Sequence, residues 1–129
     1  MAFTAGASAQ TYPTKVVRYL IPDAPGSGSD TIGRIVAEGL SDAFGQQVVV
    51  DNRPGAASTI GASIAAQAQP DGYTLLLVTA SYTISATYYR KLPYDPVKDF
   101  APVSLVASGP LLVVVHPSVA AASVQELIA

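Results

Sequence analysis

The hydrophobic pattern of the chain predicts five short buried strands. The runs are rich in aliphatic, β-branched or aromatic residues, and the second has the apolar centre of a strand buried in a parallel sheet. The first three runs are "KVVRYLI" at 15–21, "QVVVD" at 47–51 and "YTLLLVT" at 73–79. Two more follow, "VSLVAS" at 103–108 and "LLVVV" at 111–115.

A segment with helical spacing lies between the first two predicted strands. Apolar residues recur at i, i+3, i+4 and i+8 on one face, at Ile32, Ile35, Val36 and Leu40. Ser29 or Asp30 is positioned to cap the start of this helix, and Gly45 its end. The alanine-rich stretch 58–68 predicts a second helix and 84–92 a weaker third. The alternation predicts an α/β fold with a mainly parallel sheet and right-handed crossovers.

Composition excludes several classes of function. Of the 129 residues, 50% are hydrophobic and 12% charged, which is typical of a packed globular domain. The net charge is -2 and the Lys and Arg residues are scattered, so we expect no nucleic-acid partner. The chain has no Cys, and its single His, His116, ends an apolar run. These counts leave no disulfide or His-rich metal site, and no nucleophile-elbow motif is present for a Ser-His-Asp triad.

A loop of small residues, "DAPGSGSD" at 23–30, lies where the first strand gives way to a helix. Ligands of open α/β sheets bind beyond the carboxyl ends of the strands, where 52–58 and 79–82 also lie. A nucleotide does not suit the loop, because no Lys follows its glycines and Thr31 stands where a dinucleotide fingerprint needs its third Gly. A small carboxylate needs fewer donors, and hydroxyls with helix N–H groups can hold it.

Four motifs in a fixed order carry a family resemblance: "PGSGSD", "NRPGA", "PDGYTLL" and "LPYDPVKDF". In this combination the chain, from Tyr12 to its last residue, resembles the Bug proteins. These are extracytoplasmic solute receptors of tripartite tricarboxylate transporters. The resemblance implies a periplasmic binding protein type II-like fold of two lobes that closes on a small carboxylate. Residues 10–103 would form the first lobe, and 104–129 would cross into the second.

The resemblance also implies the residues that contact the ligand. They lie in the first and third loops, where the family holds carboxylate oxygens partly through water. Carried over by position, they are Ala24, Gly26, Ser27 and Ser29, with Thr79, Ala80 and Ser81. Asp23 and Tyr82, which depart from the family pattern, are added as candidate ligand contacts for their own chemistry. Asp30 matches a family Asp, and we expect it to cap helix N–H groups and shape the loop without touching the ligand. No cofactor, metal or catalytic residue is implied.

Asp23 departs from the family pattern, which usually has an aromatic residue there. A carboxylate at this position repels a second carboxylate on the ligand. It suits a ligand with an amine, a hydroxyl or a bridging metal, which widens the expected solutes to small organic acids or amino acids. We expect the ring of Tyr82 to replace the missing apolar wall.

Both ends of the chain suggest processing or truncation. "ASA" at 7–9 fits the small-x-small pattern before a signal-peptidase cleavage, so 1–9 is interpreted as a signal-peptide remnant and the protein as periplasmic. "SVQE" at 123–126 is a capping box, yet the chain ends about one turn later. We therefore expect a truncated receptor whose partners are membrane transporter subunits and, in this form, a second copy in a homodimer or larger species.

Two alternatives from other classes remain open. In the first, the chain is a structural fragment that oligomerises and binds no solute. In the second, it is a small α/β enzyme with Asp23 as general base and Ser27 or Ser81 as oxyanion donor. A screen of small carboxylates and amines separates the receptor from the first alternative.

Overall fold

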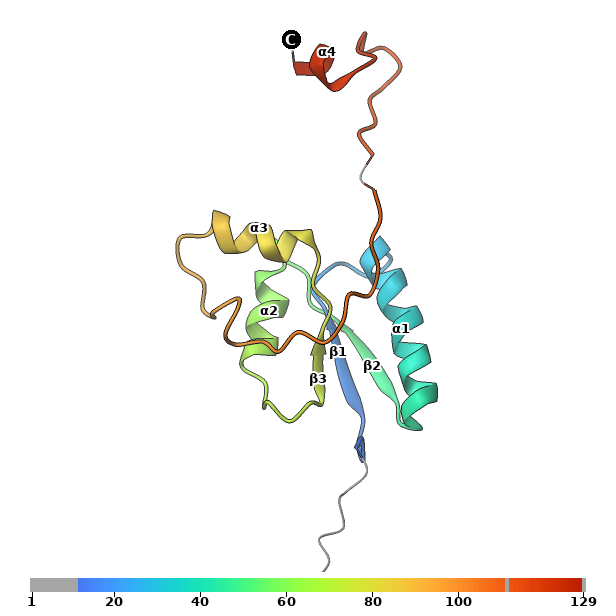
Figure 1. Ribbon diagram of the computed structural model, residues 1–129, viewed down its shortest axis with the longest axis vertical. Coiled ribbons are helices and arrows are strands. Elements are labelled where there is room, and N and C mark those ends of the chain that lie inside the picture. Colours follow the sequence, from blue (N-terminus) through green and yellow to red (C-terminus); the bar gives the residue numbers. More distant parts are fainter. Residues whose placement is uncertain (1–11, 111, 129) are drawn as a thin grey trace, which may run out of the picture.

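The computed structural model describes residues 12–110 and 112–128, so the proposed signal remnant at 1–9 lies outside the described residues. A compact body of strands and helices is followed by an extended segment and a short last helix (Figure 1). The elements are β1 (Val17–Ile21), α1 (Gly28–Phe44), β2 (Val48–Asn52), α2 (Thr59–Ala66), β3 (Thr74–Leu76), α3 (Ala80–Tyr88) and α4 (Val124–Ile128).

The sheet is parallel, and β1 lies at its centre in the order β2-β1-β3. Tyr19 is in register with Val50 on one side and Leu75 on the other. The predicted α/β class with a parallel sheet is confirmed. Because β1 has a neighbour on each side and helices over both faces, its side chains Val17, Leu20 and Ile21 are fully buried.

The helix α1 covers one face of the sheet, and the contact is closest at Gly33. A Cβ at Gly33 would collide with Cδ1 of Ile21, so hydrogen is the only side chain that fits without a shift. Ala37, one turn later, is 4% exposed in the same core. The residues that face β1 are therefore small ones, which lets the helix backbone approach the strand.

The predicted apolar face of α1 is only half right. Val36 and Leu40 pack against the core, but Ile32 and Ile35 are 39% and 66% exposed. The close approach at Gly33 turns the two isoleucines outward, because they flank the contact line instead of lying on it. Gly45 ends the helix with φ +62°, as predicted.

A second core lies on the other side of β3, between α2, α3 and the connector that follows α3. The rings of Tyr82 and Tyr94 stack with centroids 6.2 Å apart, and Phe100 packs edge-on against both. Ala62 of α2, which is fully buried, closes this cluster. The aromatic residues of the connector thus attach it to the body.

The two strands predicted at 103–108 and 111–115 are absent from the described residues, which here include all but Leu111. Residues 101–110 and 112–115 are exposed and form no strand, and Figure 1 shows this segment first crossing the body and then leading away from it. The physical reason is that a strand needs a neighbour for its backbone N–H and C=O groups, and the described residues place none beside this segment.

The capping box predicted for the last helix is present in an altered form, in which Glu126 bonds the residue before the N-cap Ser123. The Oγ of Ser123 accepts a hydrogen bond from the Glu126 N–H (3.2 Å), and the Glu126 carboxylate accepts one from the Ala122 N–H (2.7 Å). Side chain and backbone therefore satisfy one another at the start of α4. None of the described helices is both long enough and apolar enough to cross a membrane.

Candidate functional site

The carboxyl ends of the three strands meet at one edge of the sheet, where two of their loops are directly joined. The N–H of Arg53, just after β2, donates to the carbonyl of Ile21 at the end of β1 (2.8 Å). The first turn of α2 packs on the loop after β1, since a Cβ on Gly61 would lie 2.8 Å from the Cβ of Pro22. The loops after β1 and β2 are thus in contact at the sheet edge where the sequence predicts a ligand site.

The loop between β1 and α1 is closed by its own side chains. Ser27, with extended φ and ψ, is the N-cap of α1, and its Oγ accepts a hydrogen bond from the Asp30 N–H (3.2 Å). The prediction of Ser29 or Asp30 as the cap is wrong, because the helix begins already at Gly28. Gly26 takes a left-handed φ of +81°, which permits the turn into the cap.

Asp30 lies at the centre of this loop and is 3% exposed. Its Oδ2 accepts hydrogen bonds from Nε of Arg34 (3.0 Å) and from the N–H of Gly26 (2.8 Å), and its Oδ1 accepts one from Nδ2 of Asn52 (2.9 Å). These bonds, led by that of Arg34, lower the pKa of Asp30 to about 2. Asp30 shapes the loop as expected, but it does so through the Gly26 N–H, which precedes the helix.

Asp23 and the serines of the loop form a second chain of contacts. Ser29 Oγ donates to Oδ2 of Asp23 (2.6 Å), and it lies 3.0 Å from Ser27 Oγ. The hydroxyl hydrogen of Ser29 is therefore committed to a carboxylate of the protein. Asp23 and Asp30 both lie at the start of α1. Their carboxylates offset the positive end of the helix dipole, so the protein itself supplies the negative charge there.

The loop after β2 has an unusual backbone. Three successive non-glycine residues, Ala56, Ala57 and Ser58, take left-handed φ values of 45°, 50° and 72°. Ser58 is the N-cap position of α2 and is 3% exposed, but its Oγ has no hydrogen-bond partner among the described residues. The loop was predicted to lie at this edge, but Ser58 was not among the predicted contacts, and its signal in the sequence is a Ser directly before a helical stretch.

The segment 79–82 is the start of a helix and not the free loop that we predicted. Thr79 is the N-cap of α3, and Ala80 and Ser81 form its first turn. The Thr79 Oγ1 is buried and, within the described part of the chain, makes no hydrogen bond. Buried hydroxyls are normally paired, so Ser58 and Thr79 together are the exceptions that call for an explanation at this edge.

Tyr82 lies elsewhere than predicted. Its ring is 8% exposed inside the second core, and its hydroxyl donates to the Pro96 carbonyl (2.7 Å). Burial, together with the nearby Tyr94, raises the pKa of Tyr82 to about 12. The expectation that this ring forms a wall of the ligand site does not fit this position, because α3 directs it towards the connector.

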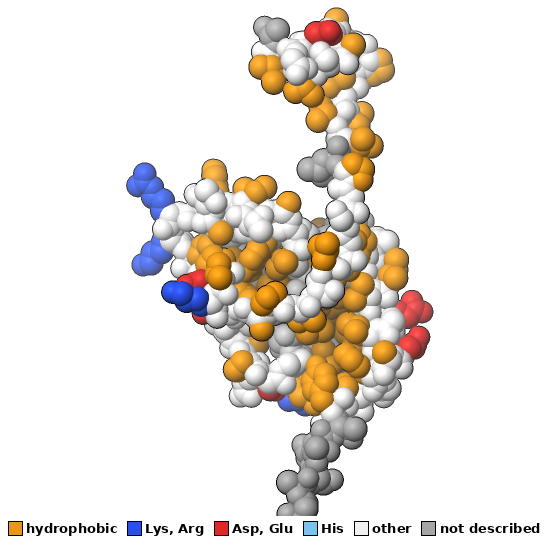
Figure 2. Space-filling view, in the orientation of Figure 1, with side chains coloured by type: hydrophobic (Ala, Val, Ile, Leu, Met, Phe, Trp, Pro, Cys, Tyr) orange, Lys and Arg blue, Asp and Glu red, His pale blue; other side chains and the backbone are white. Residues whose placement is uncertain are grey.

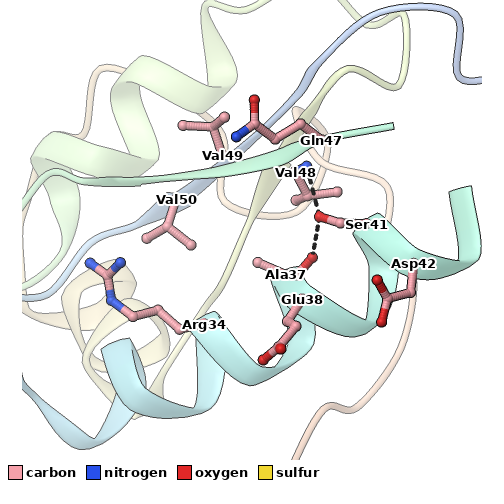
Figure 3. A pocket seen from close by; sticks show the side chains of 9 residues that line it. All are labelled: Arg34, Ala37, Glu38, Ser41, Asp42, Gln47, Val48, Val49 and Val50. Atoms are coloured by element: carbon pink, nitrogen blue, oxygen red, sulfur yellow. Dashed lines mark hydrogen bonds between the residues drawn. The ribbon is translucent and has the colours of Figure 1, made fainter. Parts of the chain in front are cut away.

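Two shallow hollows lie away from the predicted residues. One, of about 620 Å³, is lined by Thr83, Ile84, Thr87 and Tyr88 of α3. The other, of about 540 Å³, runs between α1 and β2 (Figure 3). At its floor the Ser41 Oγ bridges helix and strand, donating to the Ala37 carbonyl (2.7 Å) and accepting from the Val48 N–H (2.9 Å). Among the described residues no three His, Asp or Glu side chains gather as a metal site would require.

The chain was compared with protein families and with known proteins. Residues 32–129 match the family described as tripartite tricarboxylate transporter family receptor, TctC. The chain is 45% identical over 124 residues to a UPF0065 protein of Bordetella bronchiseptica, covering 95% of this chain and 37% of that protein. It is 39% identical over 124 residues to BugT of Bordetella pertussis, covering 95% and 38%. The chain thus spans little more than a third of the length of these relatives.

Solved structures agree with these relatives. Rpa4515 of R. palustris, solved with adipate, is 38% identical with a TM-score of 0.79, covering 91% of this chain and 40% of that one. MatC from Rhodopseudomonas palustris, with bound malate, is 33% identical with a TM-score of 0.69, covering 74% and 33%. The periplasmic binding protein BugD is 39% identical with a TM-score of 0.66, covering 70% and 30%.

The matched family and these structures confirm the resemblance and the periplasmic binding protein type of fold. They also agree with the prediction that the chain is not an enzyme, because the family is one of receptors. The chain belongs to the tripartite tricarboxylate transporter receptor family, TctC.

Proposed function

We propose that the chain captures a small carboxylate-bearing solute at the carboxyl edge of its sheet, as part of a periplasmic receptor that serves a tripartite tricarboxylate-type transporter. The observation that carries the proposal is the pair of buried, unpartnered hydroxyls of Ser58 and Thr79. Each stands at the N-cap of a helix that makes no side-chain cap bond. Helix N-termini with free donors favour anions.

The start of α3 supplies the donors for one carboxylate. The first helical N–H groups, those of Ala80 and Ser81, have no partner in the described part of the chain, as expected for the first turn of a helix. Together with the Thr79 hydroxyl they offer three donors without any Lys or Arg. Two similar receptors were solved with the carboxylates adipate and malate, which supports this class of solute.

The start of α1 offers a different chemistry. Its loop positions Ala24, Gly26, Ser27 and Ser29 remain proposed ligand contacts, but Asp23 makes this side of the site acidic. We therefore assign the ligand carboxylate to α3 and a hydrogen-bond donor, such as an amine or a hydroxyl, to the Asp23 side. Tyr82 is left out of the proposed contacts because its ring packs in the second core and its hydroxyl already donates to the Pro96 carbonyl.

A calorimetric titration tests the proposal. The chain is titrated with adipate, malate and 5-aminopentanoate, alongside Thr79→Val, which removes the hydroxyl without changing the shape of the side chain. Loss of a hydrogen bond to a charged group weakens binding about tenfold or more. Thr83→Val, one turn later on α3, is the matched control, because its hydroxyl is bonded to the Ala80 carbonyl. If no small carboxylate or amino acid binds the wild type, the proposal is wrong.

One observation favours a second candidate function, self-association. Val103, Leu105, Leu112 and Val114 are each more than 80% exposed, and Figure 2 shows hydrophobic side chains along the extended segment. Exposed apolar strands with unpaired backbone recruit other strands. A second copy that pairs through 103–115 would cover them. Light scattering at rising concentration should show a dimer that Leu105→Glu abolishes, and a wild type that stays monomeric would refute this candidate.

A further inference from the structure

The side chain of Asn52, the last residue of β2, joins three parts of the fold. Its Nδ2 donates to the main-chain carbonyl of Asp23 (3.1 Å) and to Oδ1 of Asp30 (2.9 Å). Its Oδ1 accepts a hydrogen bond from Nη2 of Arg34 (3.1 Å). The amide thus uses both of its N–H groups and its oxygen, and its partners lie in the loop after β1 and on α1.

These contacts hold both ends of the short loop that precedes α1. Asp23, at one end, is bound directly through its carbonyl. Gly26, at the other end, donates its N–H to Asp30 Oδ2 (2.8 Å), and Asp30 is itself held by Asn52. The segment between them contains Ala24, one of the proposed ligand contacts.

We infer that Asn52 is a positioning residue, which sets the shape of the ligand loop from the neighbouring strand. The inference rests on the proposed function for its consequence, since a loop of another shape would place Asp23 and Gly26 differently towards a solute. Only a neutral amide offers donors to two acceptors and an acceptor to Arg34. An Asp at this position would set a second carboxylate against Asp30.

Arg34 alone does not explain the shape of the loop. Its side chain is 55% exposed, so it holds the buried Asp30 carboxylate from the solvent side only. It also has no contact with the Asp23 carbonyl in the described structure, whereas Asn52 reaches the loop and the buried carboxylate together. Asn52 is therefore the residue to change.

The test uses the whole chain, with the variants Asn52→Ala and Asn52→Asp. Amide exchange of Gly26 and the carbon-13 titration of the Asp30 carboxyl are followed by NMR. In both variants the Gly26 N–H should exchange about tenfold faster, because its acceptor is no longer fixed. The pKa of Asp30 should rise in both, and further in Asn52→Asp because of the added negative charge.

Arg53→Gln is the control, since it removes an exposed ion pair with Asp51 beside Asn52 and leaves the amide contacts in place. Unchanged Gly26 exchange and an unchanged Asp30 titration in folded Asn52 variants would overturn the inference. Loss of cooperative unfolding in both variants would also overturn it, because Asn52 would then be required for folding as a whole and not for the shape of the loop. Adipate titration is a separate arm: if the wild type fails to bind, the proposed function fails while the NMR result still decides the role of Asn52.

Discussion

Ser29 and Asp23 are joined by a hydrogen bond of 2.6 Å from hydroxyl to carboxylate, across the loop that precedes α1. A serine that already donates to the protein is a poor donor to a solute. The group that receives the bond is an acceptor and lies at the edge of the proposed site. The pair therefore converts a loop of small polar residues, which suggested anion binding, into an acceptor.

Asp23 should determine which solute is preferred. Asp23→Asn keeps an acceptor for Ser29 and removes the charge, so affinity for adipate should rise about fivefold or more, as charges about 4 Å apart in a watery site interact by about 1 kcal/mol. Affinity for 5-aminopentanoate, which has an amine in place of one carboxylate, should fall. Calorimetry with both ligands measures the ratio, and Asp23→Phe should shift it the same way. An equal ratio in wild type and variants would mean that Asp23 faces away from the solute.

Asp30 should make folding stability sensitive to acid. Its pKa is about 2 in the folded chain against an ordinary value of 3.8, so the unfolded chain takes up the proton first as the pH falls. The stabilisation is complete above about pH 4 and is lost as the pH approaches 2. Asp30→Asn should lower the urea midpoint at pH 5 and flatten its decline between pH 4 and pH 2. A variant with the same decline as the wild type would contradict the assigned role.

Ser27 should contribute as the cap of α1. Ser27→Ala removes the acceptor of the Asp30 N–H and should cost about 1 kcal/mol of unfolding free energy. Ser27→Gly should cost only a few tenths, because glycine also serves as an N-cap. Urea unfolding of the three proteins gives the comparison. Equal stability of all three would show that another group caps the helix.

The left-handed backbone at Ala57 should be relieved by glycine. A non-glycine residue in this region costs about 1–2 kcal/mol, partly offset by the greater freedom of glycine in the unfolded chain. Ala57→Gly should therefore raise the unfolding free energy by up to about 1 kcal/mol, while Ala65→Gly within α2 should lower it by a similar amount. Thermal unfolding of both variants measures the difference. A destabilised Ala57→Gly would mean that Ala57 does not have a left-handed backbone in the folded chain.

Local signals predicted most of the fold. The first three apolar runs, the glycine after α1 and the Ser123 cap of α4 each depend on neighbouring residues, and they lie where the sequence places them. The run at 103–108 shows the limit of such signals. Its composition is that of a strand, but a strand also needs a neighbour that the composition does not reveal.

For the candidate site, the sequence predicts the loops but not the contacts between their side chains. The contact of Asn52 with Asp30 depends on how α1 is placed against β2, which no local pattern contains. The side on which Tyr82 lies depends on where α3 begins, and the helix starts at Ala80 and not after it. The contacts of the side chains therefore depend on how the helices pack against the strands, whereas the positions of the loops can be predicted from local sequence.

The central place of β1 has a consequence for synthesis on the ribosome. This strand holds the most deeply buried side chains of the sheet, yet both of its neighbours come later in the chain. While the chain is being made, β1 emerges first and can pair with β2 on one side, but its other edge stays unpaired until β3 has followed, open to water and to other nascent chains. The late arrival of β3 makes the delay longer, since distant strand pairs close slowly. A chaperone that shields Val17–Ile21 during this interval would keep the open edge of β1 from pairing with other chains.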